Sequence, residues 1–219
     1  YEKAKRLFQE DSSLFQPDTI LERFNGDEDE NLIQATGKKL GTRFPRETAR
    51  RWYFNSVRLV NEYNGDPRNI TKEPSTIEQI KARLNAFPYL RGDKLSNFYI
   101  RAMGEEGLFK IKNLDELDIP VDKQVARFTV YTGVLKLLSD RFEGCVHEDP
   151  LRSLIQESWR IAAEANKAYP WKLDEPIWTI GSKLCNKRKC DICPVEEYCY
   201  KTKGIRFRNG IIIWEKLGD

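Results

Sequence analysis

The chain has 219 residues, of which 37 are basic and 34 acidic, so its formal net charge at pH 7 is +3. This mild positive balance is compatible with many kinds of partner and singles out none. No apolar run approaches the roughly 20 residues that a membrane-spanning helix needs. We therefore expect no membrane partner. The chain is long enough to bury one substantial core or two small ones.

The N-terminal stretch YEKAKRLFQE begins with Tyr1 instead of methionine, and no secretion signal opens it. We therefore expect a fragment or a processed chain, within an intracellular compartment.

Apolar positions follow the helical period nearly throughout the chain, and Pro, Gly and Asn-Gly pairs separate the helical segments. The pattern predicts helices over residues 18–24, 28–40, 45–65, 75–87, from the hairpin at Gly92 to about Gly104, from Asp122 onward, 151–168 and 174–185. The tail carries the one credible hairpin signal, Asn209-Gly210. The predicted fold class is therefore all-α, built from many short helices.

Several polar residues are placed to begin these helices. Ser75 and Glu78 have the three-residue spacing of a capping box. Asp122 follows Pro120 and can cap the next helix, and Asp174 can do the same for the helix that leads into the cysteines. We expect each of these side chains to accept hydrogen bonds from backbone N–H groups.

Four of the five cysteines lie within fifteen residues, in the stretch CNKRKCDICPVEEYC. Thiolates are the ligands of zinc and of iron–sulfur clusters, and the spacing C-x4-C-x2-C-x5-C contains only one short C-x2-C pair. A single compact loop of this kind favours a [4Fe–4S] cluster, with zinc as the alternative, and the predicted ligands are Cys185, Cys190, Cys193 and Cys199. The odd total and the clustering argue against a disulfide scaffold. The pattern assigns no role to the fifth cysteine, Cys145, or to the single histidine, His147.

The same stretch resembles the iron–sulfur loop of the endonuclease III group of helix-hairpin-helix DNA glycosylases. Its last three cysteines have the spacing of that group, whereas the gap between Cys185 and Cys190 is shorter than usual there. In the family this gap touches DNA phosphates. The resemblance therefore implies that Lys187, Arg188 and Lys189 bind DNA.

Two further motifs of that family lie upstream in the family's order. GDKLSN, with Gly92 and Lys94, resembles the end of the DNA-binding hairpin, and IPVDKQVARF places Asp122 at the start of a later helix. The resemblance implies that Lys94 is the nucleophile and that Asp122 is the carboxylate that activates it or stabilises the sugar cation. The hairpin lacks the first glycine of the usual pattern. The 28 positions from Lys94 to Asp122 (122 − 94) are more than is common in the endonuclease III group, although archaeal 8-oxoguanine glycosylases also have a longer gap.

The resemblance covers roughly residues 1–203 and implies a two-lobed fold with a C-terminal iron–sulfur loop. We expect a helical barrel domain over residues 18–121 and a cluster domain made of residues 1–17 and 122–219. The implied function is a DNA glycosylase with AP-lyase activity, acting as a monomer on double-stranded DNA with a lesion or mismatch, in the cytoplasm or nucleoid. The alternatives are a monofunctional glycosylase and a non-enzymatic, metal-containing DNA-binding module.

Overall fold

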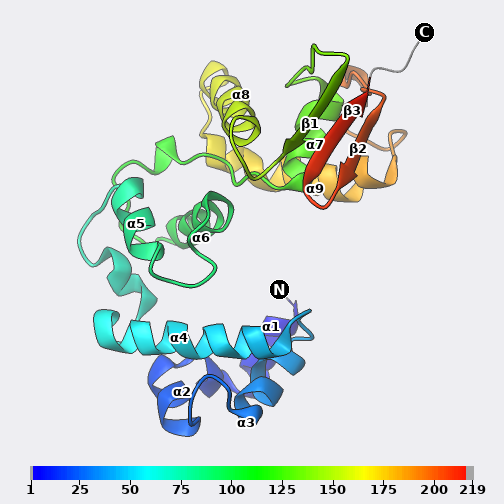
Figure 1. The fold of residues 1–219 in the computed structure, drawn as a ribbon. Coiled ribbons are helices and arrows are strands. Elements are labelled where there is room, and N and C mark those ends of the chain that lie inside the picture. The colour runs from blue at the N-terminus through cyan, green and yellow to red at the C-terminus, as the bar shows by residue number, and fades with distance from the viewer. Residues whose placement is uncertain (1, 216–219) are drawn as a thin grey trace. The chain divides into compact units, whose positions relative to one another are not determined.

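The computed structural model describes residues 2–215, and they are mostly helical, as the sequence predicts (Figure 1). Within that range, every helix is too short or too polar to cross a membrane. The chain divides into two compact units. Unit 1 comprises residues 2–92 and Met103–Lys112, and unit 2 comprises Asp93–Ala102 and residues 113–215.

Unit 1 is built from helices, several of them a single turn long. Their bounds are α1 Glu2–Glu10, η1 Ser12–Phe15, α2 Pro17–Arg23, α3 Glu30–Ile33, the π-helical turn η2 Gln34–Lys38, α4 Pro45–Tyr63, η3 Pro67–Thr71 and α5 Ile77–Leu84. The longest, α4, starts at a proline, which suits a first turn, and ends at Asn64 in the left-handed conformation (φ 51°). In Figure 1, α2 and α3 lie along the same side of α4.

The first residues of the chain pack in unit 1, which differs from the boundary expected from the resemblance. Leu7 and Leu14 are buried in one apolar cluster with Ile20, Phe24, Leu32, Ile33 and Ala49. Leu7 and Leu14 therefore share their core with residues of α2, α3 and α4. No pattern along the chain indicates this pairing, because a short apolar run does not specify which face it will cover.

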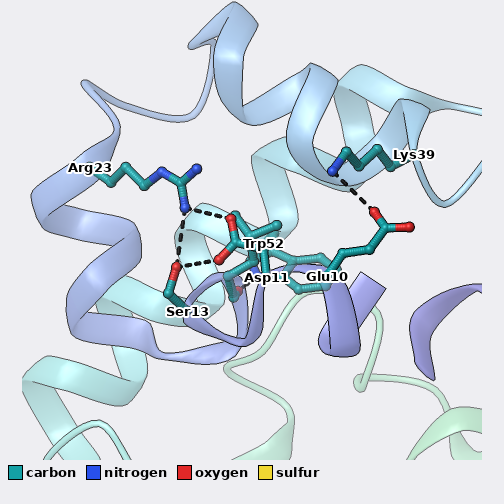
Figure 2. A network of polar contacts seen from close by, with 7 residues as sticks. Glu10, Asp11, Ser13, Arg23, Lys39 and Trp52 are labelled. Atoms are coloured by element: carbon teal, nitrogen blue, oxygen red, sulfur yellow. Dashed lines mark hydrogen bonds and ion pairs between the residues drawn. The ribbon is translucent and has the colours of Figure 1, made fainter. Parts of the chain in front are cut away.

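Polar contacts hold the same N-terminal segment in place (Figure 2). Arg23 forms an ion pair with Asp11 at 2.7 Å, and Lys39 forms one with Glu10 at 3.3 Å. Exposed pairs of this kind contribute little stability. The indole N–H of Trp52 donates a hydrogen bond to the carbonyl of Leu14 at 2.9 Å, and this bond fixes the orientation of the ring.

The helix caps confirm part of the expected pattern and correct the rest. The capping box at α5 is formed by Thr76 and Gln79, one residue later than the predicted pair of Ser75 and Glu78. Ser75 is buried, and its backbone instead bonds with the 110–112 segment. Asp174 is the first residue of its helix and not the cap, which is Leu173. Its buried carboxylate lies 3.5 Å from a guanidinium nitrogen of Arg101, so an ion pair takes the place of the expected cap.

Unit 2 contains helices and a small antiparallel sheet. Their bounds are η4 Leu114–Glu116, α7 Lys123–Thr132, β1 Arg141–Cys145, α8 Leu151–Ala165, η5 Pro170–Leu173, α9 Asp174–Lys183, η6 Cys185–Lys187, η7 Glu196–Tyr198, β2 Ile205–Arg208 and β3 Ile211–Glu215, together with the first ten residues of α6 Asp93–Glu105. Every residue of α7 from Val125 to Thr132 is buried. Its surroundings are α8, α9 and the inner face of the sheet, which share one apolar core with it (Figure 1).

The sheet has the strand order β1-β3-β2. The predicted hairpin joins β2 to β3, and Asn209 (φ 49°) and Gly210 (φ 84°) both have the positive φ that a type I′ turn requires. The third strand, β1, pairs Arg141–Cys145 with β3 and was not predicted. Its sequence, RFEGC, has no apolar alternation that would predict a strand. Its partner strand β3 comes from the far end of the chain, so no local pattern indicates the pairing.

The crossing of α7 and α9 positions the candidate site described below. A Cβ atom at Gly181 of α9 would lie 2.3 Å from the carbonyl oxygen of Gln124 of α7. Only glycine permits this approach.

We expect Gly181→Ala to destabilise the protein by about 1–3 kcal/mol, because the added methyl group overlaps backbone that cannot rotate away. Urea unfolding measures the change. The helix preference of alanine, about 1 kcal/mol, acts in the opposite direction and makes the observed loss a lower bound on the packing cost. Lys183→Ala, an exposed change on the same helix, should shift stability by no more than about 0.5 kcal/mol. Equal effects of the two changes would contradict the close crossing.

Candidate active site and cysteine loop

Lys94 lies in the first turn of α6, and its neighbours on that helix attach it to the rest of unit 2. Asp93 forms an ion pair with Arg152 of α8 at 2.8 Å. The buried amide of Asn97 donates a hydrogen bond to the carbonyl of Asp118 at 3.2 Å. These contacts fix the start of α6 and leave the side chain of Lys94 45% exposed.

Asp122 is the N-cap of α7, as predicted. Its Oδ1 accepts hydrogen bonds from the backbone N–H groups of Gln124 (2.7 Å) and Val125 (3.1 Å). The segment just before it is held by α8, whose Gln156 side chain donates to the carbonyl of Ile119 at 3.3 Å. One carboxylate oxygen therefore accepts the free N–H groups at the start of α7. Because these bonds fix the carboxylate, they also fix the position of the second oxygen.

The second oxygen, Oδ2, faces two other side chains. The amine of Lys94 lies 3.9 Å from it, and the indole N–H of Trp178 donates a hydrogen bond to it at 3.1 Å. The carboxylate is only 15% exposed. The structure thus brings Lys94 and Asp122 together within one unit, at a distance that a bound substrate could shorten to a hydrogen bond.

Trp178 was not predicted as a site residue. It lies on α9, 56 positions after Asp122 (178 − 122), and a single tryptophan on an amphipathic helix usually belongs to the core. No signal in the sequence links it to the carboxylate, because the contact depends on the crossing of α7 and α9.

The four clustered cysteines line one pocket in unit 2, together with Leu184, Val195 and Tyr131. The thiol of Cys199 donates a hydrogen bond to the carbonyl of Tyr131 at 3.4 Å, and its sulfur accepts one from the backbone N–H of Lys201 at 3.4 Å. The fifth cysteine, Cys145, lies apart from them in β1.

Burial raises the pKa of the Cys185 thiol to about 11, and repulsion from the other three sulfurs adds to the effect, with Cys193 first among them. The sulfurs therefore lie close enough to oppose one another's ionisation. Nevertheless, across residues 2–215, no group of three or more His, Cys, Asp and Glu side chains is placed to hold a metal ion. The donor chemistry fits a metal or an iron–sulfur cluster, whereas the side chains as they stand do not converge on one point.

The residues predicted to bind DNA phosphates are exposed. Lys187, Arg188 and Lys189 have exposed side chains, and the guanidinium carbon of Arg188 lies 4.9 Å from the ring centre of Tyr131. Gly92 is also exposed, directly before α6. Each position is accessible to a large partner, and its role stays a prediction.

Comparison with known proteins identifies the family. The family model AGOG, described as N-glycosylase/DNA lyase, matches residues 94–206, which are 113 of the 219 residues. The chain belongs to the AGOG family. This assignment supports the predicted helix-hairpin-helix glycosylase superfamily, while the narrower likeness to endonuclease III stays a prediction. No curated protein and no solved structure matches the chain.

The AGOG match begins at Lys94 and also contains Asp122, Trp178 and the cysteine loop. All the chemistry-bearing residues considered so far except Gly92 therefore lie in the matched region. Most of unit 1 lies outside it.

The capping role of Asp122 can be tested separately from any catalytic role. In this AGOG-family chain we expect Asp122→Ala to lower the free energy of unfolding by about 1 kcal/mol, because two N–H groups of α7 lose their acceptor. Asp122→Asn should stay within a few tenths of a kcal/mol of wild type, since asparagine caps helices as well as aspartate does. Guanidinium unfolding of the three proteins checks this. An asparagine variant as unstable as the alanine variant would show that the charge, and not the cap, stabilises the fold.

Proposed function

We propose that this chain is a DNA N-glycosylase with lyase activity that removes a damaged or mispaired base from double-stranded DNA. The observation that carries the proposal is the pairing of the Lys94 amine with the Asp122 carboxylate at 3.9 Å, inside the region matched by the AGOG family. An amine next to a carboxylate is the pair of groups that cleavage of the glycosidic bond by a covalent route requires.

In the proposed reaction the target base first leaves the DNA stack. The lone pair of the neutral Lys94 amine forms a bond to the sugar carbon C1′ while the bond from C1′ to the base breaks, and the base leaves with that electron pair. The nitrogen passes one proton to Asp122, and Asp122 passes it on to the departed base. The sugar ring then opens: O4′ keeps the electrons of its bond to C1′ and takes a proton from water, and the nitrogen lone pair forms the protonated Schiff base on Lys94. In the β-elimination, water takes a proton from C2′, a C=C bond forms, and the C3′–O bond breaks as the phosphate leaves with its electron pair.

Asp122 has a second task in this scheme. Positive charge develops on the sugar as the base departs, and a fixed carboxylate stabilises it without reorganising. The N–H groups of Gln124 and Val125 and the indole of Trp178 hold the carboxylate in one orientation. Trp178 is therefore a positioning residue in this proposal.

Borohydride reduction tests the Schiff base. Wild type incubated with abasic-site DNA and borohydride should form a covalent protein–DNA adduct, and Lys94→Ala should form none, because no amine attacks C1′. Asp122→Asn should lower the rate of base release by about 10²–10³-fold. Gel electrophoresis of the adduct and of the cleaved strand measures both.

Lys123→Ala is the matched control, because Lys123 is exposed and directly follows Asp122. It should form the adduct like wild type. Base release without any adduct would favour the monofunctional glycosylase, in which Lys94 only contacts DNA. If no lesion in a panel of damaged oligonucleotides is excised, the chain is a DNA-binding module and not an enzyme.

We also propose that Cys185, Cys190, Cys193 and Cys199 hold a [4Fe–4S] cluster, with zinc as the alternative. The support is the donor set: four thiols line one pocket, and a backbone N–H already bonds to the sulfur of Cys199. Such a cluster would brace the loop that carries Lys187, Arg188 and Lys189.

Metal analysis distinguishes the two groups. Protein purified without oxygen should contain about four iron and four sulfide per chain, and Cys193→Ala should lose most of this iron. Cys145→Ala should keep it, because Cys145 lies in the sheet. One zinc per chain with no iron or sulfide would show that the four cysteines bind zinc and not an iron–sulfur cluster.

A further inference from the structure

A hollow of about 330 Å³ opens in unit 1, outside the region that the AGOG family model matches. Its walls come from η1, the start of α2, α4 and the turn that follows α5. Pockets for small ligands usually begin near 300 Å³. The hollow is therefore large enough for one ring system of the size of a nucleobase, and the chemistry proposed for Lys94 and Asp122 does not use it.

Aromatic rings form much of its wall, namely those of Phe15, Trp52 and Tyr89. The ring of Trp52 cannot turn freely, because its N–H is bonded to the carbonyl of Leu14 and Phe15 packs edge-on against it at 5.2 Å. A rigid aromatic wall of this kind suits the stacking of a flat ligand.

Two polar atoms in the lining of this hollow have no hydrogen-bond partner within the described part of the chain. They are Nη1 of Arg51 and Oδ1 of Asn55, and both are buried. The other guanidinium nitrogens of Arg51 bond to Glu47 at 2.6 Å, and the group stacks on the ring of Tyr89. Leaving a buried donor and a buried acceptor unpaired costs stability, so such atoms call for an explanation. As the side chains stand, neither atom is open to the hollow, so a ligand edge that offers an acceptor and a donor, as nucleobase edges do, would meet them once these side chains turn.

A second hollow adjoins the first and shares Arg51 and Tyr89 with it. Its lining adds Arg50, Arg91 and Glu47. Arg50 also forms an ion pair with Asp27 at 3.0 Å. Three guanidinium groups against two carboxylates leave one positive charge (3 − 2), which suits the single charge of a phosphodiester better than the larger charge of a free nucleotide's phosphate.

The wall shared by the two hollows is strained. Tyr89 has φ 76°, a left-handed conformation that is rare for a bulky side chain. Strained backbone of this kind is frequently found where a ligand is clamped.

We propose that these two hollows bind one nucleotide of a DNA strand whose base has left the stack, with the base beside Trp52 and Asn55 and its phosphate beside Arg91. The choice of a DNA strand rests on the function proposed above. The geometry of the paired hollows is independent of it.

Fluorescence anisotropy with undamaged, labelled DNA tests the proposal without any turnover. Wild type should bind a duplex with one unpaired, bulged purine about tenfold more tightly than the same duplex fully paired, because stacking of the free base adds to the phosphate contacts. Asn55→Leu and Tyr89→Ala should abolish this preference. Arg91→Gln should reduce the slope of log affinity against log salt by about one, the effect of one lost phosphate contact.

Arg58→Gln is the matched control, because Arg58 lies on the same helix, pairs with Glu62 as Arg51 pairs with Glu47, and lines neither hollow. It should keep the preference for the bulged duplex. Thermal unfolding adds a second readout. Asn55→Leu should raise the melting temperature while it weakens binding, since it removes an unpaired buried oxygen. If Tyr89→Ala fails to fold, Asn55→Leu and its melting temperature decide the matter.

Several outcomes would overturn the proposal. The first is a preference for bulged DNA that survives Asn55→Leu, and another is a wild type with no preference. If a deoxynucleoside monophosphate at micromolar concentration displaces the bulged duplex, the site takes a free nucleotide and the assignment to a strand is wrong. Preference for bulged DNA without excision of any lesion would defeat the proposed function and leave this inference standing. Excision of a lesion by a protein whose DNA binding is unchanged by Asn55→Leu would support the proposed function and defeat this inference.

Discussion

The carboxylate of Asp122 is the interaction on which the candidate site depends. One oxygen accepts the two N–H groups at the start of α7, and this fixes where the other oxygen points. Trp178 and Lys94 then approach that second oxygen from α9 and α6. The side chain of Asp122 therefore both caps α7 and presents the carboxylate of the candidate site. Because α7 is buried, it holds this carboxylate rigidly, as a preorganised site requires.

Packing around α7 explains why this arrangement holds. Phe128 stacks on Trp159 of α8 at 5.8 Å, and the indole N–H of Trp159 donates to the hydroxyl of Thr129 at 2.8 Å. On another side Gly181 lets α9 approach the backbone of α7. The apolar core of unit 2 thus positions polar atoms from helices that are far apart in the sequence, because a close-packed interior permits few alternative placements.

The cysteine loop and the first hollow of unit 1 are the places for which the proposals above name a ligand. In the hollow, Arg51 and Asn55 each bury an atom that has no partner within the described part of the chain, and such atoms weaken a fold. At the cysteines the support is the donor set, because four thiols line one pocket.

The sequence by itself determined the helical class, the Asn209-Gly210 hairpin and the cap at Asp122, because local propensity is written along the chain. Its resemblance to the helix-hairpin-helix glycosylases supplied the candidate pair of Lys94 and Asp122. Only the tertiary structure decided which segments share a core. It placed residues 2–17 in unit 1, added β1 to the hairpin, moved the capping box to Thr76 and brought Trp178 to the carboxylate. These features depend on contacts between residues that are distant in sequence, and no local pattern carries that information.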